Sequence, residues 1–152
     1  MIGDWIDKVN YPQLPALTDK ELLAFFEQEQ FARLGTLNAD GTIHIAPIFF
    51  KYDHGQLIMA SQCPSRKVRN IKCNPNVTVL IDNTQVPFKG ALIYGKAELE
   101  YEDAVNKRVE IFTRRLPEED ARTYATRLSN KWQCVIIRIT PIRIASFDYS
   151  KT

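Results

Sequence analysis

The stretch "SQCPSRKVRNI", residues 61–71, contains the residues whose types and spacing most strongly suggest chemistry. Its pattern predicts a strand end, a turn and a short helix over residues 66–73, with Ser65 as the N-cap and Arg66 and Lys67 directly after it. Because a helix N-terminus carries partial positive charge, each cation there costs about 0.3–1 kcal/mol. A bound phosphate would remove this conflict, since free backbone N–H groups, the helix dipole and both cations would all favour it.

Two further side chains extend this candidate anion site. Ser61 and Gln62 lie at the end of the preceding strand and can donate hydrogen bonds from the other side. Arg66 can hold a phosphate through two parallel hydrogen bonds, and Lys67 adds a mobile point charge. The alternative is a solvated surface face, which is the usual role of a run of charges.

No side chain stands out as a catalytic group or as a metal ligand. The chain has two histidines: His54 falls in a turn signal, and His44 shares a strand face with apolar residues, where a structural role is the simpler interpretation. The sequence has no CxxC or HExxH pair, no phosphate-binding glycine loop and no nucleophile elbow. Any difficult chemistry is therefore expected to come from a bound organic cofactor, and neither a catalytic residue nor a metal site is predicted.

Composition limits the class of protein. The 152 residues are expected to form a single domain over residues 1–152, and their net charge of +2 does not favour nucleic acid or membrane as a partner. The N-terminal stretch lacks the pattern of a signal peptide. The three cysteines (Cys63, Cys73 and Cys134) show no disulfide or metal spacing, which suits a reducing compartment. We therefore expect a cytoplasmic protein with free thiols.

Hydrophobic periodicity predicts a mainly β, α+β fold. After a loose start, a helix is expected over residues 17–30, with Thr18 and Glu21 as a capping box. Strands are expected over residues 31–37, 42–52, 57–61, 77–82, 91–101 and 132–150, the last interrupted at Pro141. Two helices lie between the last two strands, and Gly95 suggests a bulge. About six strands joined by tight turns indicate an antiparallel barrel.

The order of these motifs resembles one known family. The runs "LIMASQCPSRKVRNIKCNPNVTVLI" and "ALIYGKAELE", within residues 31–101, are similar to the FMN-binding split β-barrel proteins related to pyridoxamine 5′-phosphate oxidase. The resemblance implies a six-stranded antiparallel split β-barrel with flanking helices. It also implies a homodimer with the flavin at the subunit interface and residues near Lys89 and Gly90 of the partner subunit completing the site.

The resemblance assigns site residues position by position. Arg66 and Lys67 would bind the FMN phosphate, Ser61 would touch it beside Ala60, and Gln62 and Ser65 belong to the same element. The second barrel strand would line the flavin ring through its backbone, at Ala46, Pro47, Ile48 and Phe49. Pro47 has no N–H, so its contact must use the carbonyl or packing.

One departure from the family pattern narrows the function. The chain ends "RIASFDYSKT" and lacks the Trp- and Arg-His-containing segment of the pyridoxamine-phosphate oxidases, so a vitamin B6 phosphate is not the expected substrate. The interpretation is an FMN-binding oxidoreductase that moves hydride to or from an unidentified small planar substrate.

Three alternatives stay open. The first is a reductase that uses the deazaflavin coenzyme F-420, whose acidic tail would need extra cations, for which Arg33 and Lys51 are candidates. The second is haem binding, with His44 as its candidate ligand. The third is a flavin store, sensor or electron carrier without turnover. Arg66 and Lys67 do not separate FMN from the deazaflavin, because both cofactors carry a phosphate.

Overall fold

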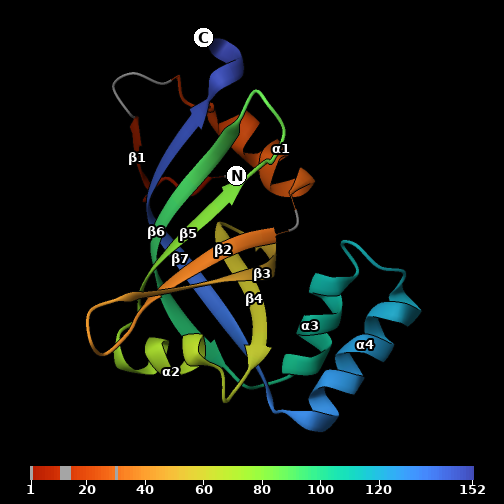
Figure 1. Ribbon diagram of the computed structural model, residues 1–152. Helices are drawn as coiled ribbons and strands as arrows, with labels where there is room; N and C mark the ends of the chain where they lie inside the picture. Colours follow the sequence, from red (N-terminus) through yellow and green to blue (C-terminus); the bar gives the residue numbers. More distant parts are fainter. Residues whose placement is uncertain (1, 11–14, 30) are drawn as a thin grey trace.

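The computed structural model describes residues 2–10, 15–29 and 31–152, and its main feature is a closed barrel of six antiparallel strands (Figure 1). The order around the barrel is β7–β4–β3–β2–β5–β6, and β6 pairs with β7 to close it. The strands are β2 (Phe31–Leu37), β3 (Ile43–Asp53), β4 (Gln56–Gln62), β5 (Asn76–Asp82), β6 (Lys89–Glu100) and β7 (Cys134–Asp148). The predicted antiparallel barrel is confirmed.

Among the described residues, four α-helices flank the barrel and a short 3₁₀ helix, η1 (Tyr149–Lys151), follows β7. Figure 1 shows their arrangement. The α-helices are α1 (Asp19–Gln28), α2 (Arg66–Cys73), α3 (Ala104–Phe112) and α4 (Glu118–Lys131). Helices α1 and α2 lie at opposite ends of the barrel, whereas α3 and α4 pack beside it. None of the described helices combines the length and the apolar character needed to cross a membrane.

The structure contains the predicted capping box of α1 and the two predicted tight turns. The Thr18–Glu21 capping box is formed in both directions, while Gln30, the end of the predicted helix, lies outside the described residues. Gly41 in the β2–β3 turn has φ +88°, and His54 and Gly55 in the β3–β4 turn have φ +48° and +83°. Positive φ at both central residues is what a two-residue hairpin turn requires, and His54 and Gly55 meet this requirement. The β2–β3 turn is longer and uses a single left-handed residue, Gly41.

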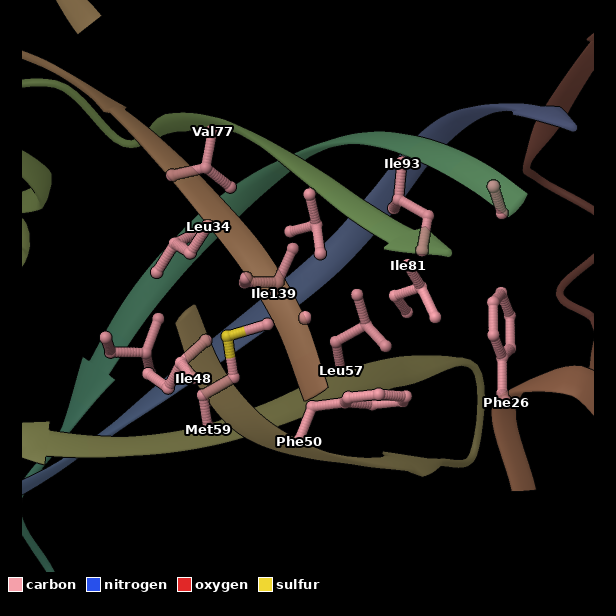
Figure 2. Packing of buried hydrophobic residues seen from close by; sticks show 14 of the residues in the cluster. Phe26, Leu34, Ile48, Phe50, Leu57, Met59, Val77, Ile81, Ile93 and Ile139 are labelled. Carbon is pink, nitrogen blue, oxygen red and sulfur yellow. The ribbon is translucent and has the colours of Figure 1, made fainter. Parts of the chain in front are cut away.

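Two apolar clusters stabilise the fold. The first fills the barrel and includes residues of all six strands and of the two end helices; Figure 2 shows part of it, including Phe26, Leu34, Phe50, Leu57, Met59 and Ile93. The second lies between α3–α4 and the outer face of β4 and β7, around Ile58, Phe112 and Ile136. The outer barrel face next to β4 is therefore covered by helix, which matters for the site described below.

Three predictions about strands are wrong. The loose start contains a further strand, β1 (Asp7–Asn10), which pairs parallel to β7. Tyr101 is exposed and lies beyond β6. Pro141 does not interrupt β7: Tyr94 pairs with Arg143 and Gly95 with Pro141, so a bulge at this point absorbs the proline. The indole N–H of Trp5 donates to the Pro141 carbonyl at 3.2 Å.

Gly95 is needed at the bulge because the two backbones approach closely there. A Cβ atom at this position would lie 2.6 Å from the Thr140 carbonyl oxygen and 3.0 Å from Cγ2 of Ile139. We expect Gly95→Ala to lower the free energy of unfolding by about 1–3 kcal/mol, the usual cost of overpacking. Urea unfolding measures this directly, and a variant as stable as the original protein would contradict the close approach.

Candidate functional site

Strands β3 and β4 separate where the sequence predicts the flavin contacts. Strand β3 pairs with β2 from Ile43 to Phe49, but its ladder with β4 begins at the pair Phe50–Met59 and runs only toward the turn. Beyond Met59, β4 pairs with β7, as far as Gln62 opposite Cys134. We call the divergent segments, residues 46–49 of β3 and 60–62 of β4, the β3–β4 fork. Figure 1 shows β3 running away from β4 toward the β2–β3 turn.

The fork leaves one backbone edge of each strand without a neighbouring strand. Backbone N–H and C=O groups of residues 46–49 that point away from β2 have no ladder partner on β4, so they are available to a ligand. The side chains alternate: Ile48 is in the barrel core, whereas Pro47 is exposed and Phe49 stacks on Phe31 at 4.4 Å on the outer face. Residues 46–49 can therefore contact a planar group mainly through backbone and Pro47.

The start of α2 lies directly after the fork. Ser65 is the N-cap: its Oγ accepts a bond from the Val68 N–H at 3.4 Å and lies 3.1 Å from Oγ of the buried Ser61. The first helical bond joins the Arg69 N–H to the Ser65 carbonyl. The N–H groups of Arg66 and Lys67 consequently have no acceptor within the helix, as an anion site requires.

The two predicted cations differ in burial and in the charged groups near them. Arg66 is exposed and near the β2–β3 turn, where its charge adds slightly to the hydrogen bonds from Thr42 that lower the pKa of Asp40. Lys67 is half-buried, and burial followed by the charge of Arg108 lowers its pKa below the ordinary 10.5. Among the ion pairs formed by the described residues, none includes Arg66 or Lys67.

Arg108 of α3 was not predicted and is the most unusual charged residue near this site. It is only 2% exposed, and its Nε and Nη1 are buried without a hydrogen-bond partner. Its guanidinium carbon lies 5.9 Å from the centre of the Phe112 ring. A signal existed in the sequence, because Arg108 occupies a helical position between Val105 and Phe112 that otherwise carries apolar residues.

Other candidates from the sequence are paired or lie elsewhere. Arg33 forms an ion pair with Asp82 at 2.9 Å, and Lys51 lies 3.8 Å from Glu110, so neither is a free cation for an acidic cofactor tail. Lys89 lines a hollow of about 600 Å³ together with Phe31, Arg33, Pro47 and Asp82. Lys89 of the same chain, and not only of a partner subunit, therefore lies near Pro47 of the fork.

Histidine and cysteine placement adds no metal site. His44 is half-buried on β3, opposite Thr36 of β2, and His54 is exposed in its turn, 2.6 Å from Asp53. All three cysteines are free thiols. Within the described ranges, no three of the residues His, Cys, Asp and Glu come together as metal ligands.

Exposed apolar side chains of β2, β3, β6 and β7 line one hollow on the outside of the barrel. Ile43 and Ile45 are 66% and 64% exposed, and Leu37, Tyr94 and Ile142 are also exposed there. Together with residues of β5 they surround a shallow hollow of about 990 Å³. A contiguous exposed apolar face of this kind is typical of a protein–protein contact. We call these five exposed residues the outer apolar face.

The closed six-stranded barrel with its β3–β4 fork defines a class of protein by its fold, the split β-barrels. The family model described as pyridoxamine 5′-phosphate oxidase matches residues 18–143, and the chain belongs to this family. No curated protein matches the sequence.

Solved structures share the barrel at low identity. The conserved hypothetical protein Rv2991 from Mycobacterium tuberculosis aligns with a TM-score of 0.79 at 20% identity, over 94% of this chain and 91% of that one. A putative pyridoxamine 5′-phosphate oxidase from Listeria innocua gives 0.63 at 24% identity over 84% and 95%. A protein named F-420 reductase gives 0.64 at 22% over 80% and 93%. At these identities the comparisons establish the fold.

Proposed function

We propose that this chain is a flavin-binding protein that holds FMN with its phosphate at the start of α2 and its ring along the β3–β4 fork. One observation supports the proposal most directly: two segments with unsatisfied backbone groups lie close together. They are residues 46–49, whose edge toward β4 has no partner strand, and the start of α2, whose first N–H groups have no acceptor and which carries two cations. Ser61, Ser65, Arg66 and Lys67 supply phosphate ligands, with Ala60 and Gln62 lining the approach.

The orphaned nitrogens of Arg108 support the fit of an anionic group to this region. A buried guanidinium without a partner is costly, and a phosphate at the neighbouring Lys67 would lower that cost. The family match supports a flavin as the group that carries the phosphate.

Each element has a defined task in this proposal. When bound, FMN supplies hydride transfer at N5 of its ring. Backbone N–H groups of the fork would donate to the polar edge of the ring, while Pro47 contributes packing in place of a donor. The helix start would fix the phosphate end, so that the ring is positioned by both strands and helix. No side-chain base is assigned.

We also propose that the protein is a homodimer in which the outer apolar face is buried. The exposed Ile43 and Ile45 lie on the same strand as the fork, so a second copy packed there would reach the open end of the ring site. An isologous contact uses one self-complementary patch on both copies. We propose a cytoplasmic location, which suits the three free thiols.

We propose an oxidoreductase that acts on a small planar substrate. The second candidate is a coenzyme F-420 reductase, favoured by the structural neighbour of that name and by the same phosphate site. It is weakened by the ion pairs of Arg33 and Lys51, which leave fewer cations for an acidic tail.

The test is cofactor identity followed by turnover. The visible spectrum of the purified protein and mass analysis of any released molecule come first, and FMN, riboflavin and coenzyme F-420 are then titrated into the ligand-free fraction. We expect FMN to bind much more tightly than riboflavin, because riboflavin lacks the phosphate. Reoxidation of the reduced protein is then measured with and without added quinones or nitroaromatics.

Each outcome of this test has a distinct meaning. Binding of F-420 without FMN would replace the first candidate by the second. Flavin retention without faster reoxidation by any acceptor would favour a store or carrier over an oxidoreductase. Failure of both cofactors to bind would overturn the proposal.

A further inference from the structure

Arg108 and Lys67 form a pair of neighbouring cations that no carboxylate separates. Arg108 has an ion pair with none of the acidic side chains of the described chain, and its charge contributes, after burial, to the lowered pKa of Lys67. Two like charges in a partly buried setting repel each other. A protein that keeps this arrangement gains stability whenever an anion lies between the two cations.

The backbone places Arg108 next to the fork. Ala104, one turn before Arg108 on α3, accepts a hydrogen bond from the Cys134 thiol at 3.6 Å. Cys134 is the register partner of Gln62, the last residue of β4. The first turns of α3 therefore lie beside the end of β4, from which the chain continues through Ser65 into α2.

Burial distinguishes Arg108 from the surface cations of this protein. Its guanidinium lies over the Phe112 ring, and Nε and Nη1 have neither solvent nor a hydrogen-bond acceptor. Leaving a charged donor buried and unpaired costs at least as much as a lost hydrogen bond to a charge. Packing alone does not require an arginine at position 108. A methionine of similar length would fill the same space without burying an unpaired charge.

We propose that Arg108 is the inner wall of the anion site, and that Lys67 and Arg108 together hold the phosphate that enters at the start of α2. The proposal rests on the proposed function for the identity of the cofactor, but not for the existence of the anion site. Lys67 is the more exposed of the two, so the anion enters from its side and Arg108 closes the site from α3.

The proposed site therefore takes ligands from two helices, α2 and α3. The family motif contains the residues of α2, whereas Arg108 of α3 lies outside that motif. The contact of Arg108 with the phosphate should increase the preference for ligands that carry a phosphate. It should separate FMN from riboflavin more strongly than the α2 cations do alone, since the guanidinium can form two parallel hydrogen bonds to one phosphate.

The experiment compares the unmodified protein with Arg108→Met, and uses Arg69→Met on the exposed face of α2 as the matched control. The first readout is the thermal unfolding midpoint in inorganic phosphate against sodium chloride at equal ionic strength. We expect phosphate to raise the midpoint of the unmodified protein and of the control, and to have little effect on Arg108→Met. In chloride, Arg108→Met should be as stable as the unmodified protein or more so, because an unpaired buried charge has been removed.

The second readout is the ratio of the dissociation constants for riboflavin and FMN. We expect Arg108→Met to bind FMN about tenfold more weakly or worse, with riboflavin affinity unchanged. Equal phosphate stabilisation in Arg108→Met and the unmodified protein would overturn the role of Arg108, as would a lower midpoint of this variant in chloride. An unmodified protein that phosphate stabilises but FMN does not bind would retain the anion site and reject FMN as its ligand.

Discussion

Replacing Lys67 by alanine is expected to weaken FMN binding roughly 10- to 100-fold without unfolding the protein, because a hydrogen bond to a charged group contributes about 1.5–3 kcal/mol. Lys67 is half-buried at the helix start and has no ion pair with the described residues, so its removal deletes no salt bridge of the ligand-free protein. Quenching of flavin fluorescence gives the dissociation constant, and circular dichroism checks the fold.

Lys72→Ala is the matched control for this prediction. Lys72 lies in the last turn of the same helix and is exposed, so its loss changes the net charge equally but removes no proposed ligand. FMN affinity should stay close to that of the unmodified protein. If Lys67→Ala and Lys72→Ala bind FMN equally well, the cations of α2 are a solvated surface, as the sequence alone also allowed.

The pH dependence gives an independent readout of Lys67. Burial and Arg108 lower the pKa of Lys67 in the free protein, and a bound phosphate must raise it again by favouring the charged amine. Binding at a pH above the lowered pKa is then accompanied by proton uptake, so FMN affinity should fall as pH rises through the lowered pKa. A Lys67→Arg variant, which stays charged, should lose this decline. Identical profiles for both proteins would contradict phosphate binding by Lys67.

Placing a charge on the outer apolar face should separate the proposed dimer. Ile45 is 64% exposed in the single chain, so Ile45→Asp should leave the barrel intact. In an isologous dimer, the same change would bury an unpaired carboxylate on each of the two copies, which costs several kcal/mol per ion. We expect the mass in solution, measured by light scattering after size-exclusion chromatography, to fall from two chains to one, together with weaker FMN retention.

Val86→Asp provides the comparison for the dimer prediction. Val86 is 81% exposed in the connection between β5 and β6 and does not belong to the outer apolar face. This variant should keep the mass of the unmodified protein. If the unmodified protein itself has the mass of one chain over the whole concentration range, the dimer proposal is wrong.

The sequence determined the parts of this protein that depend on neighbouring residues. The capping box at Thr18, the positive φ at Gly41 and Gly55 and the N-cap at Ser65 all follow from interactions within a few positions. The alternation in β6 predicted its buried face, and Gly95 predicted the bulge. The same kind of local pattern, a conflict between two cations and the helix dipole, predicts an anion site at the start of α2, and that site stays a prediction.

The tertiary structure decided what depends on residues far apart in the chain. The pairing of β1 with β7 and the passage of β7 through Pro141 depend on contacts with distant strands, which leave no local pattern. The β3–β4 fork exists because the closed barrel makes β3 change its partner from β4 to β2 at Phe50. The proposed role of Arg108 likewise depends on the packing of α3 against β4 and β7, which no local pattern shows. An apolar stripe in the sequence of a helix predicts that a residue on it is buried. Only the assembled fold shows which charged group that residue faces.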